Sequence, residues 1–163
     1  MTTAVMTTAV ELLALERRVR RSGSGVDEAA LVGCWHLDQV WPKGSERPSA
    51  FSGSLLRAVG ARLEITSGEA GTGELTLFNV VSLGQLQLRF CGVGRLQGNR
   101  PLLQFSFQQL QLKIGGRLVL QQSLPQSAPQ RLPFFALIGR DPSGWLAARG
   151  RGGGLALWRL GHS

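Results

Sequence analysis

The amino-acid sequence predicts a mainly β protein, an antiparallel β-barrel with a short helix at its N-terminus. Three observations predict this class. Short apolar segments separated by glycines recur from residue 31 onward, and residues 85–90 alternate between polar and apolar side chains. No segment alternates strand and helix as a parallel sheet requires. We therefore divide the chain into a helix with a Gly/Ser linker, residues 1–25, and a single barrel domain, residues 26–163.

The N-terminal helix is predicted from its first turn. Thr8 and Glu11 have the spacing of a capping box, in which each side chain satisfies the backbone N–H of the other residue. Leu12, Leu15 and Val19 then follow one face, and four arginines gather at the C-terminal end, where the helix dipole favours cations. A helix packed on the barrel is the simpler interpretation, and a helix that binds a membrane surface or a partner is the alternative.

Nine segments have the composition and length of strands. They are residues 31–40, 54–66, 74–81, 85–91, 102–114, 117–124, 134–138, 145–149 and 155–160. In the longest of them, the apolar side chains change from odd positions to even positions at Gln108-Gln109. Such a change predicts a β-bulge, which lets a long strand curl around a closed barrel.

Two glycine-rich segments are predicted to be turns. Residues 149–154 contain arginine and glycine, as RGG-type nucleic-acid tails do, but they form one short segment between two apolar strands. We interpret them as a hairpin turn and expect no nucleic-acid partner. Residues 92–94 and Gly98 lack the strand–loop–helix context of a dinucleotide-binding loop and are also predicted to turn the chain.

The charge is strongly asymmetric. The chain carries a net charge of +8, and from Gly84 onward nine arginines and one lysine face a single acidic residue, Asp141. This half favours an anionic membrane surface, an acidic partner or nucleic acid. A solvated basic surface without a dedicated partner is the other interpretation.

Groups for catalysis or metal binding are few. His36 lies in the first strand, His162 lies next to the C-terminus, and no spacing typical of a zinc site or a serine hydrolase occurs. We expect no enzymatic activity, no metal and no cofactor. Cys34 and Cys91 both occur in strand-like segments, which predicts reduced, buried thiols and a cytoplasmic location.

Gly33-Cys34-Trp35 opens the first strand and resembles the signature of lipocalin-like barrels. The glycine allows close backbone approach, and the indole fills the bottom of the core. An arginine of the last strands is expected to stack on Trp35, with Arg149 and Arg159 as the candidates.

Both ends of the predicted barrel resemble the plastid lipid-associated protein (fibrillin) family. Residues 31–37 are similar to its opening Leu-x-Gly-x-Trp-x-Leu, and residues 104–107 to its central Val-x-Phe segment. Arg149-Gly150, the turn residue Gly153 and the apolar residues 155–158 are similar to its closing hairpin. The chain departs from the family at residues 139–142, where Tyr-Leu-Asp is usual, and at Leu146, where arginine is usual.

The resemblance implies a lipocalin-like barrel that binds or sequesters a lipophilic molecule such as a lipid, quinone or carotenoid. It also implies a cyanobacterial-type protein that is peripheral to the thylakoid membrane. The candidate ligand-binding residues are Leu88, Phe90, Phe105, Phe107 and Trp158. Two alternatives remain: a lipocalin-like chromophore lyase or chaperone, and an interaction module with a filled barrel and a basic face. An apolar cavity of about 300 Å³ or more would favour ligand binding.

Overall fold

The computed structural model describes residues 8–44, 61–69, 71–98, 101–126, 128 and 131–161. In chain order, the elements are α1 (Ala9–Ser22), α2 (Glu28–Leu31), β1 (Gly33–Trp41), β2 (Arg62–Ser67), β3 (Glu74–Leu83), β4 (Leu86–Gln97), β5 (Leu102–Ile114), β6 (Arg117–Ser123), β7 (Phe134–Asp141), β8 (Trp145–Gly150) and β9 (Leu155–Gly161). The strand predicted over residues 54–66 lies partly outside the described residues, and His162 lies outside them altogether.

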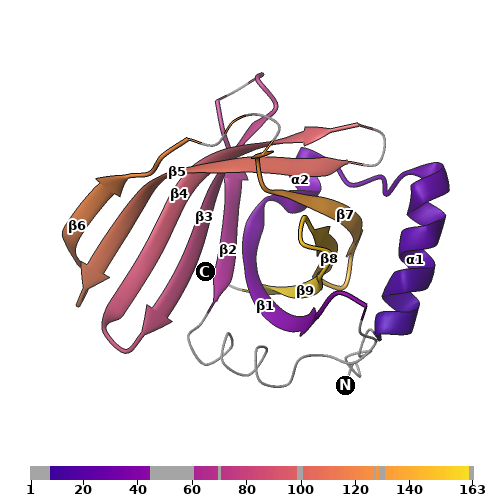
Figure 1. Cartoon of the computed structure of the whole chain (residues 1–163), viewed down its shortest axis with the longest axis horizontal. Helices are drawn as coiled ribbons and strands as arrows, with labels where there is room; N and C mark the ends of the chain where they lie inside the picture. Colours follow the sequence, from indigo (N-terminus) through magenta and orange to yellow (C-terminus); the bar gives the residue numbers. More distant parts are fainter. Residues whose placement is uncertain are drawn as a thin grey trace.

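The nine strands form one antiparallel sheet that closes on itself. Eight of them make a ring in the order β1, β2, β3, β4, β5, β7, β8 and β9, and β9 pairs again with β1. The mainly β, barrel-like prediction is therefore confirmed. Figure 1 shows β1, β7, β8 and β9 curving around the interior of the ring, with α1 at one side.

The strand β5 belongs both to the ring and to an extension of the sheet. Its first residues pair with β7, whereas its second half pairs with β6, and β4 pairs along its whole length. The far parts of β3, β4 and β5 therefore leave the ring together with β6 (Figure 1). We call this extension, residues 79–83, 86–90, 110–114 and 117–122, the open lobe.

The predicted bulge in β5 is present. Cys91 of β4 pairs with Gln109, but the next residue, Gly92, pairs with Phe107, so Gln108 is the extra residue. A Cβ atom on Gly92 would collide with the Ser106 carbonyl oxygen and lie 2.8 Å from the Phe107 Cα. The prediction that residues 92–94 form a turn is wrong, because they lie within β4. Glycine is needed at position 92 for the close approach of the two strands.

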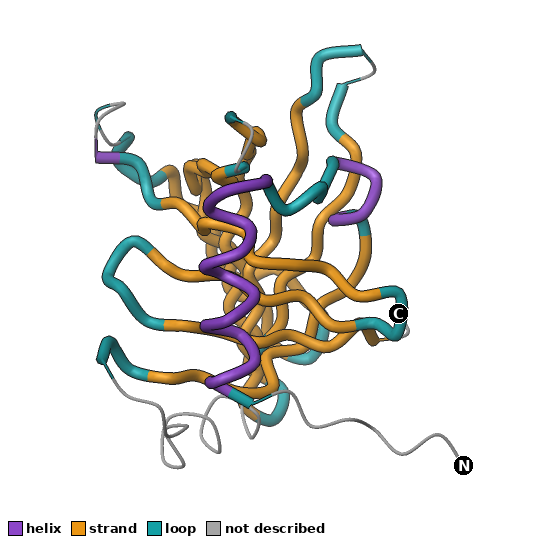
Figure 2. The backbone as a smooth tube through the Cα atoms, turned by 90° about the vertical axis from the view of Figure 1, so that its right-hand side faces the viewer, coloured by secondary structure: helices purple, strands orange, loops and turns teal. Residues whose placement is uncertain are grey.

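Two layers of apolar side chains hold the fold together. The larger layer fills the ring and includes Trp35, Ile65, Leu77 and Leu103. The second lies on the outer surface of β7, β8 and β9, where Leu12 of α1 packs with Ile138, Ala147 and Leu157. Figure 2 shows α1 lying across these strands. The helix packed on the barrel, the simpler of the two interpretations, is thus what the structure contains.

Both helices begin with a side-chain cap. The Thr8–Glu11 capping box of α1 is formed as predicted, with hydrogen bonds of 3.2 and 2.8 Å. The helix α2 is not among the predicted elements; at its start Asp27 accepts a hydrogen bond from the Ala30 N–H. The first strand consequently begins at Gly33 and not at Leu31.

Candidate ligand-binding site

A mainly apolar cavity of about 190 Å³ opens at the end of the ring next to the lobe. Nine of its eleven lining residues are apolar, and Arg62 and Asn79 are the other two. Four aromatic side chains contribute to the wall: Phe105, Phe107, Phe135 and Trp158. The cavity is smaller than the ~300 Å³ of a typical small-molecule pocket, so it has room for only part of a ligand of that size.

A continuous chain of aromatic rings leads from the lobe into the cavity. The Phe90 and Phe107 ring centroids are 5.9 Å apart, and those of Phe107 and Phe105 are 5.4 Å apart. Phe135 stacks on Phe105 at 5.0 Å and meets Trp158 edge-on at 5.2 Å. These distances are typical of favourable aromatic pairs. Four of the five predicted ligand-binding residues therefore lie in one contiguous cluster.

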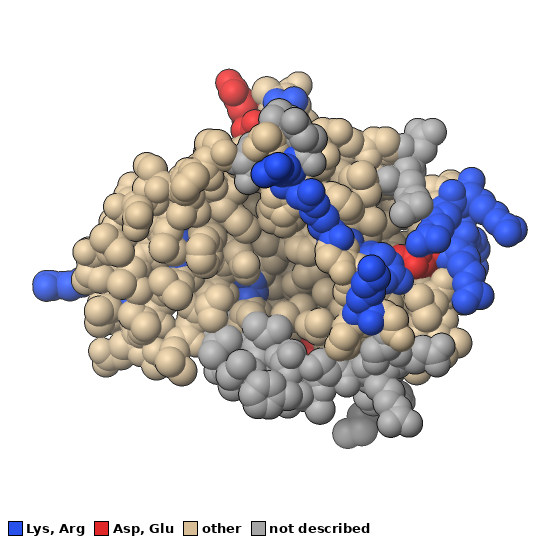
Figure 3. Space-filling view, in the orientation of Figure 1, with Lys and Arg blue, Asp and Glu red and all other residues tan. Residues whose placement is uncertain are grey.

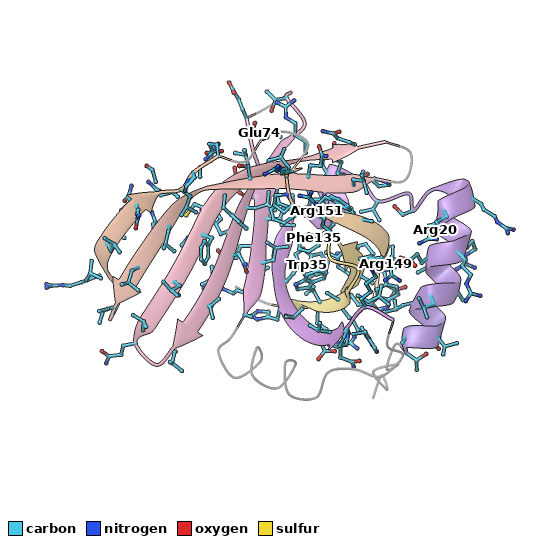
Figure 4. All side chains as sticks on the ribbon, in the orientation of Figure 1. Arg20, Trp35, Glu74, Phe135, Arg149 and Arg151 are labelled. Carbon is cyan, nitrogen blue, oxygen red and sulfur yellow. The ribbon has the colours of Figure 1, made fainter. Side chains whose placement is uncertain are left out.

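Phe135 is the member of this cluster that the sequence analysis missed. It stands next to Phe134 at the start of β7, so the pattern of apolar residues does not show which ring points inward. Figure 4 shows Phe135 and Trp35 inside the ring.

The fifth predicted residue, Leu88, lies on the open lobe. In the register of the lobe, Val81, Leu88, Leu112 and Leu120 occupy neighbouring positions on β3 to β6. Adjacent rows place Leu83, Leu86, Ile114, Phe90 and Leu110 on the same face, which we call the apolar face. The opposite face carries Ser82, Gln87, Gln111, Lys113 and Gln121.

The apolar face is continuous with the cavity. Every second residue of β3 from Leu77 to Leu83 points to the same face. Leu77 lies in the core, Asn79 and Val81 line the cavity, and Leu83 lies on the lobe. The exposed fraction of these side chains rises from the ring to the end of the lobe: Leu77 is fully buried, and Leu83 is 67% exposed. Ile114 and Leu120 are each 48% exposed. Contiguous exposed apolar surface of this kind marks an interaction site more often than a chance feature of the surface.

Trp35 is fully buried in the core, and its partner differs from the predicted one. The indole Nε1 donates a 2.8 Å hydrogen bond to the Leu31 carbonyl oxygen. The guanidinium of Arg140 lies 5.3 Å from the ring centroid. The prediction that Arg149 or Arg159 stacks on Trp35 is wrong, since these arginines form ion pairs with Glu16 and Asp38.

Strand alternation explains this correction. Leu146 and Ala148 of β8 and Trp158 of β9 point into the ring, so Arg149 and Arg159 point outward. In β7 the register shifts between Leu137 and Gly139, and this bulge turns Arg140 to the side of Trp35.

Among the other signature glycines, Gly150 and Gly153 form the predicted turn. The Gly153 N–H donates to the Gly150 carbonyl oxygen over 2.9 Å, which closes the turn between β8 and β9. Gly153 has a φ of 92°, a conformation that favours glycine. A Cβ atom on Gly33 would lie 2.7 Å from Leu160 Cδ1, which is the end of a flexible side chain and not the backbone approach that the sequence predicts.

Cys34 and His36 are neighbours on the outer face of β1. The Cys34 Sγ lies 3.7 Å from the His36 Nε2. Burial, and then the negative charge of Glu64, raise the pKa of the Cys34 thiol, which is opposite to the shift that activates a nucleophilic cysteine. Cys34 and Cys91 are free thiols but half-buried, so the expectation of full burial is wrong. Among the described residues, no three metal-ligating side chains cluster together.

Neither described helix has the length and apolar composition needed to cross a bilayer. Comparisons with protein-family models, with curated proteins and with solved structures find no significant match to this chain.

Proposed function

We propose that this protein binds an elongated lipophilic molecule, such as a lipid, quinone or carotenoid, and holds it without transforming it. The observation that carries the proposal is the continuity between the aromatic-lined cavity and the apolar face of the lobe. One end of the ligand would enter the cavity, and the rest would lie along the apolar face.

This division suits the size of the cavity. A cavity of about 190 Å³ holds only part of such a molecule, but each methylene that leaves water contributes about 0.8 kcal/mol wherever it is buried. The half-exposed rows around Leu88 and Phe90 extend the apolar contact area beyond the cavity mouth. The cavity is smaller than the about 300 Å³ that would favour ligand binding by itself, so the proposal depends on the cavity together with the apolar face, and the interaction module stays the alternative.

The resemblance to lipocalin-like, plastid lipid-associated proteins supports the same function. The closing hairpin at Gly150 and Gly153 and the buried Trp35 are the features on which this resemblance depends. Residence at the thylakoid membrane is part of this proposal. Leu146, which stands where the family has arginine, points into the core, so a ligand contact by that arginine has no counterpart here.

The direct test is native mass spectrometry of protein purified without detergent from its own host. We expect a co-purifying lipophile that organic solvent extracts. A second measurement is titration of the delipidated protein with cis-parinaric acid, followed by its fluorescence. No co-purifying lipophile together with no binding of the fatty acid would overturn the proposal.

A variant pair tests where the ligand binds. Val81 lines the cavity, and Val81→Trp fills space at its mouth. We expect this variant to bind cis-parinaric acid about tenfold more weakly or worse. The matched control is Val10→Trp on the exposed side of α1, which should bind as the wild type does. Equal affinity of Val81→Trp and wild type would contradict a ligand in this cavity.

A further inference from the structure

The open lobe ends in two hairpin turns that are joined to each other. One turn connects β3 to β4 through Gly84-Gln85, and the other connects β5 to β6 through Gly115-Gly116. The Gly115 N–H donates a 3.0 Å hydrogen bond to the Gln85 carbonyl oxygen, so the two turns form one protruding end. Figure 1 shows both turns at the far end of the lobe, away from the ring. We call this end the lobe tip.

The lobe tip exposes apolar side chains on both faces of the sheet. Leu83, Leu86 and Ile114 stand in one row on the apolar face, and all three are exposed. Leu118 pairs with Lys113 on the opposite face and is 50% exposed. A protein partner that covers one face of the sheet would leave the other apolar side chains in water.

The charge at the lobe tip is positive. Lys113 precedes Ile114 on β5, and Arg117 pairs with Ile114 from β6. Residues 75–140 contain no aspartate or glutamate. Within the described ranges, neither Lys113 nor Arg117 has a carboxylate at ion-pair distance. Figure 3 shows the lobe as a largely uncharged surface from whose end a basic side chain projects.

We propose that the lobe tip docks on the surface of an anionic lipid bilayer. Lipid can surround the apolar side chains of a protruding end, here Leu83, Leu86 and Ile114 on one face and Leu118 on the other, and two flanking cations can meet anionic headgroups. An anionic bilayer therefore matches both the apolar side chains and the charge of the lobe tip. Two other cations of this half are already engaged, since Arg89 pairs with Glu64 and Arg95 with Glu74.

Docking at this end connects the bilayer to the cavity. From the lobe tip the apolar face leads past Leu88 and Phe90 to Phe107 at the cavity wall. A lipophile could thus move from the bilayer to the barrel along apolar contacts. This last step depends on the proposed ligand binding, whereas the docking itself does not.

Vesicle co-sedimentation with the full chain tests the docking. The vesicles are phosphatidylcholine, with and without phosphatidylglycerol. We expect wild type to sediment with the anionic vesicles. Two double variants of the lobe tip, Leu83→Gln/Ile114→Gln and Lys113→Glu/Arg117→Glu, should each bind these vesicles about tenfold more weakly or worse. The matched controls are Val10→Gln/Leu160→Gln, which alters exposed apolar residues elsewhere, and Arg17→Glu/Arg21→Glu, which alters cations of α1. Both controls should sediment as wild type does.

Three outcomes would overturn the proposal. Wild type fails to bind anionic vesicles, the lobe-tip variants bind them as wild type does, or the Arg17→Glu/Arg21→Glu control loses binding instead. A wild-type dimer that Leu83→Gln/Ile114→Gln converts to a monomer in analytical ultracentrifugation would also overturn it, because the lobe tip would then be a protein interface.

The docking and the proposed function fail separately. Val81→Trp should lose cis-parinaric acid and keep vesicle binding, whereas Lys113→Glu/Arg117→Glu, which alters no apolar side chain, should keep cis-parinaric acid and lose the vesicles. Vesicle binding by a wild type that binds no lipophile would leave the docking intact and reject only the proposed ligand binding.

Discussion

Glu16 of α1 and Arg149 of β8 form a two-point ion pair across 133 positions of the chain. The Nε and Nη2 atoms of Arg149 donate to the two carboxylate oxygens over 2.7 and 2.9 Å, and Nη1 donates to the Gly153 carbonyl oxygen. Glu16 is only 5% exposed. The same arginine therefore attaches the helix to the barrel and stabilises the closing turn. The carboxylate beside Arg149 raises the pKa of its guanidinium further above its usual range. Figure 4 shows Arg149 on the side of the ring that faces α1.

Glu16→Gln should therefore lower the free energy of unfolding by about 2 kcal/mol, because it removes a charge-assisted, bidentate contact and leaves Arg149 without its counter-ion. Urea denaturation measures this change. The control is Arg20→Gln. Arg20 is exposed and forms a longer ion pair of 3.5 Å with the same carboxylate. It should cost about 0.5 kcal/mol or less. Equal effects of the two variants would argue against the special role of Arg149.

Gly92→Ala should destabilise the barrel, because its Cβ has no room beside the backbone of Ser106 and Phe107 at the bulge. Backbone atoms cannot move aside as a flexible side chain can, so we expect a loss of about 2 kcal/mol or more in thermal or urea unfolding. Gly152→Ala is the control, because no atom lies within 4 Å of the position of its Cβ. A fully stable Gly92→Ala variant would show that the bulge can relax.

Phe135→Leu should weaken both stability and ligand binding. The substitution removes two ring contacts, with Phe105 and Trp158, which together contribute about 1 to 3 kcal/mol. We expect a comparable loss in the free energy of unfolding and weaker binding of cis-parinaric acid. Phe134→Leu changes the neighbouring residue, which does not line the cavity, and should leave the affinity unchanged. The reverse order of effects would mean that Phe134 is the ring that meets the ligand.

The Cys34 thiol should react slowly with iodoacetamide. Its pKa is raised by burial and by the carboxylate of Glu64, so at a given pH less of it is the reactive thiolate than in an unperturbed cysteine. The pH profile of its alkylation, followed by peptide mass spectrometry, should lie at higher pH than that of a model thiol. Glu64→Gln removes the charge contribution and should shift the profile toward lower pH. A profile at or below that of the model thiol would contradict this account.

Local sequence patterns predicted much of the fold. The capping box at Thr8 and Glu11, the bulge at Gln108 and the closing turn at Gly153 are all present. Each depends on residues close together in the chain, whose hydrogen bonds, steric demands and alternation act whatever lies opposite. The strand at residues 102–114 has the predicted bounds for the same reason.

Tertiary structure decided which side chains meet. A period of two shows that alternate residues share a face but not which face is inside. The sequence therefore does not single out Phe135, and it offers Arg149 and Arg159 as partners of Trp35 in place of Arg140. The burial of Glu16 was equally hidden, because its partner lies 133 positions away. The open lobe arises because β5 exchanges one neighbour for another along its length. The sequence by itself therefore determined the strands, caps and bulge, which are local. Only tertiary structure decided the ring, the lobe and the aromatic path, because these depend on pairing between distant strands.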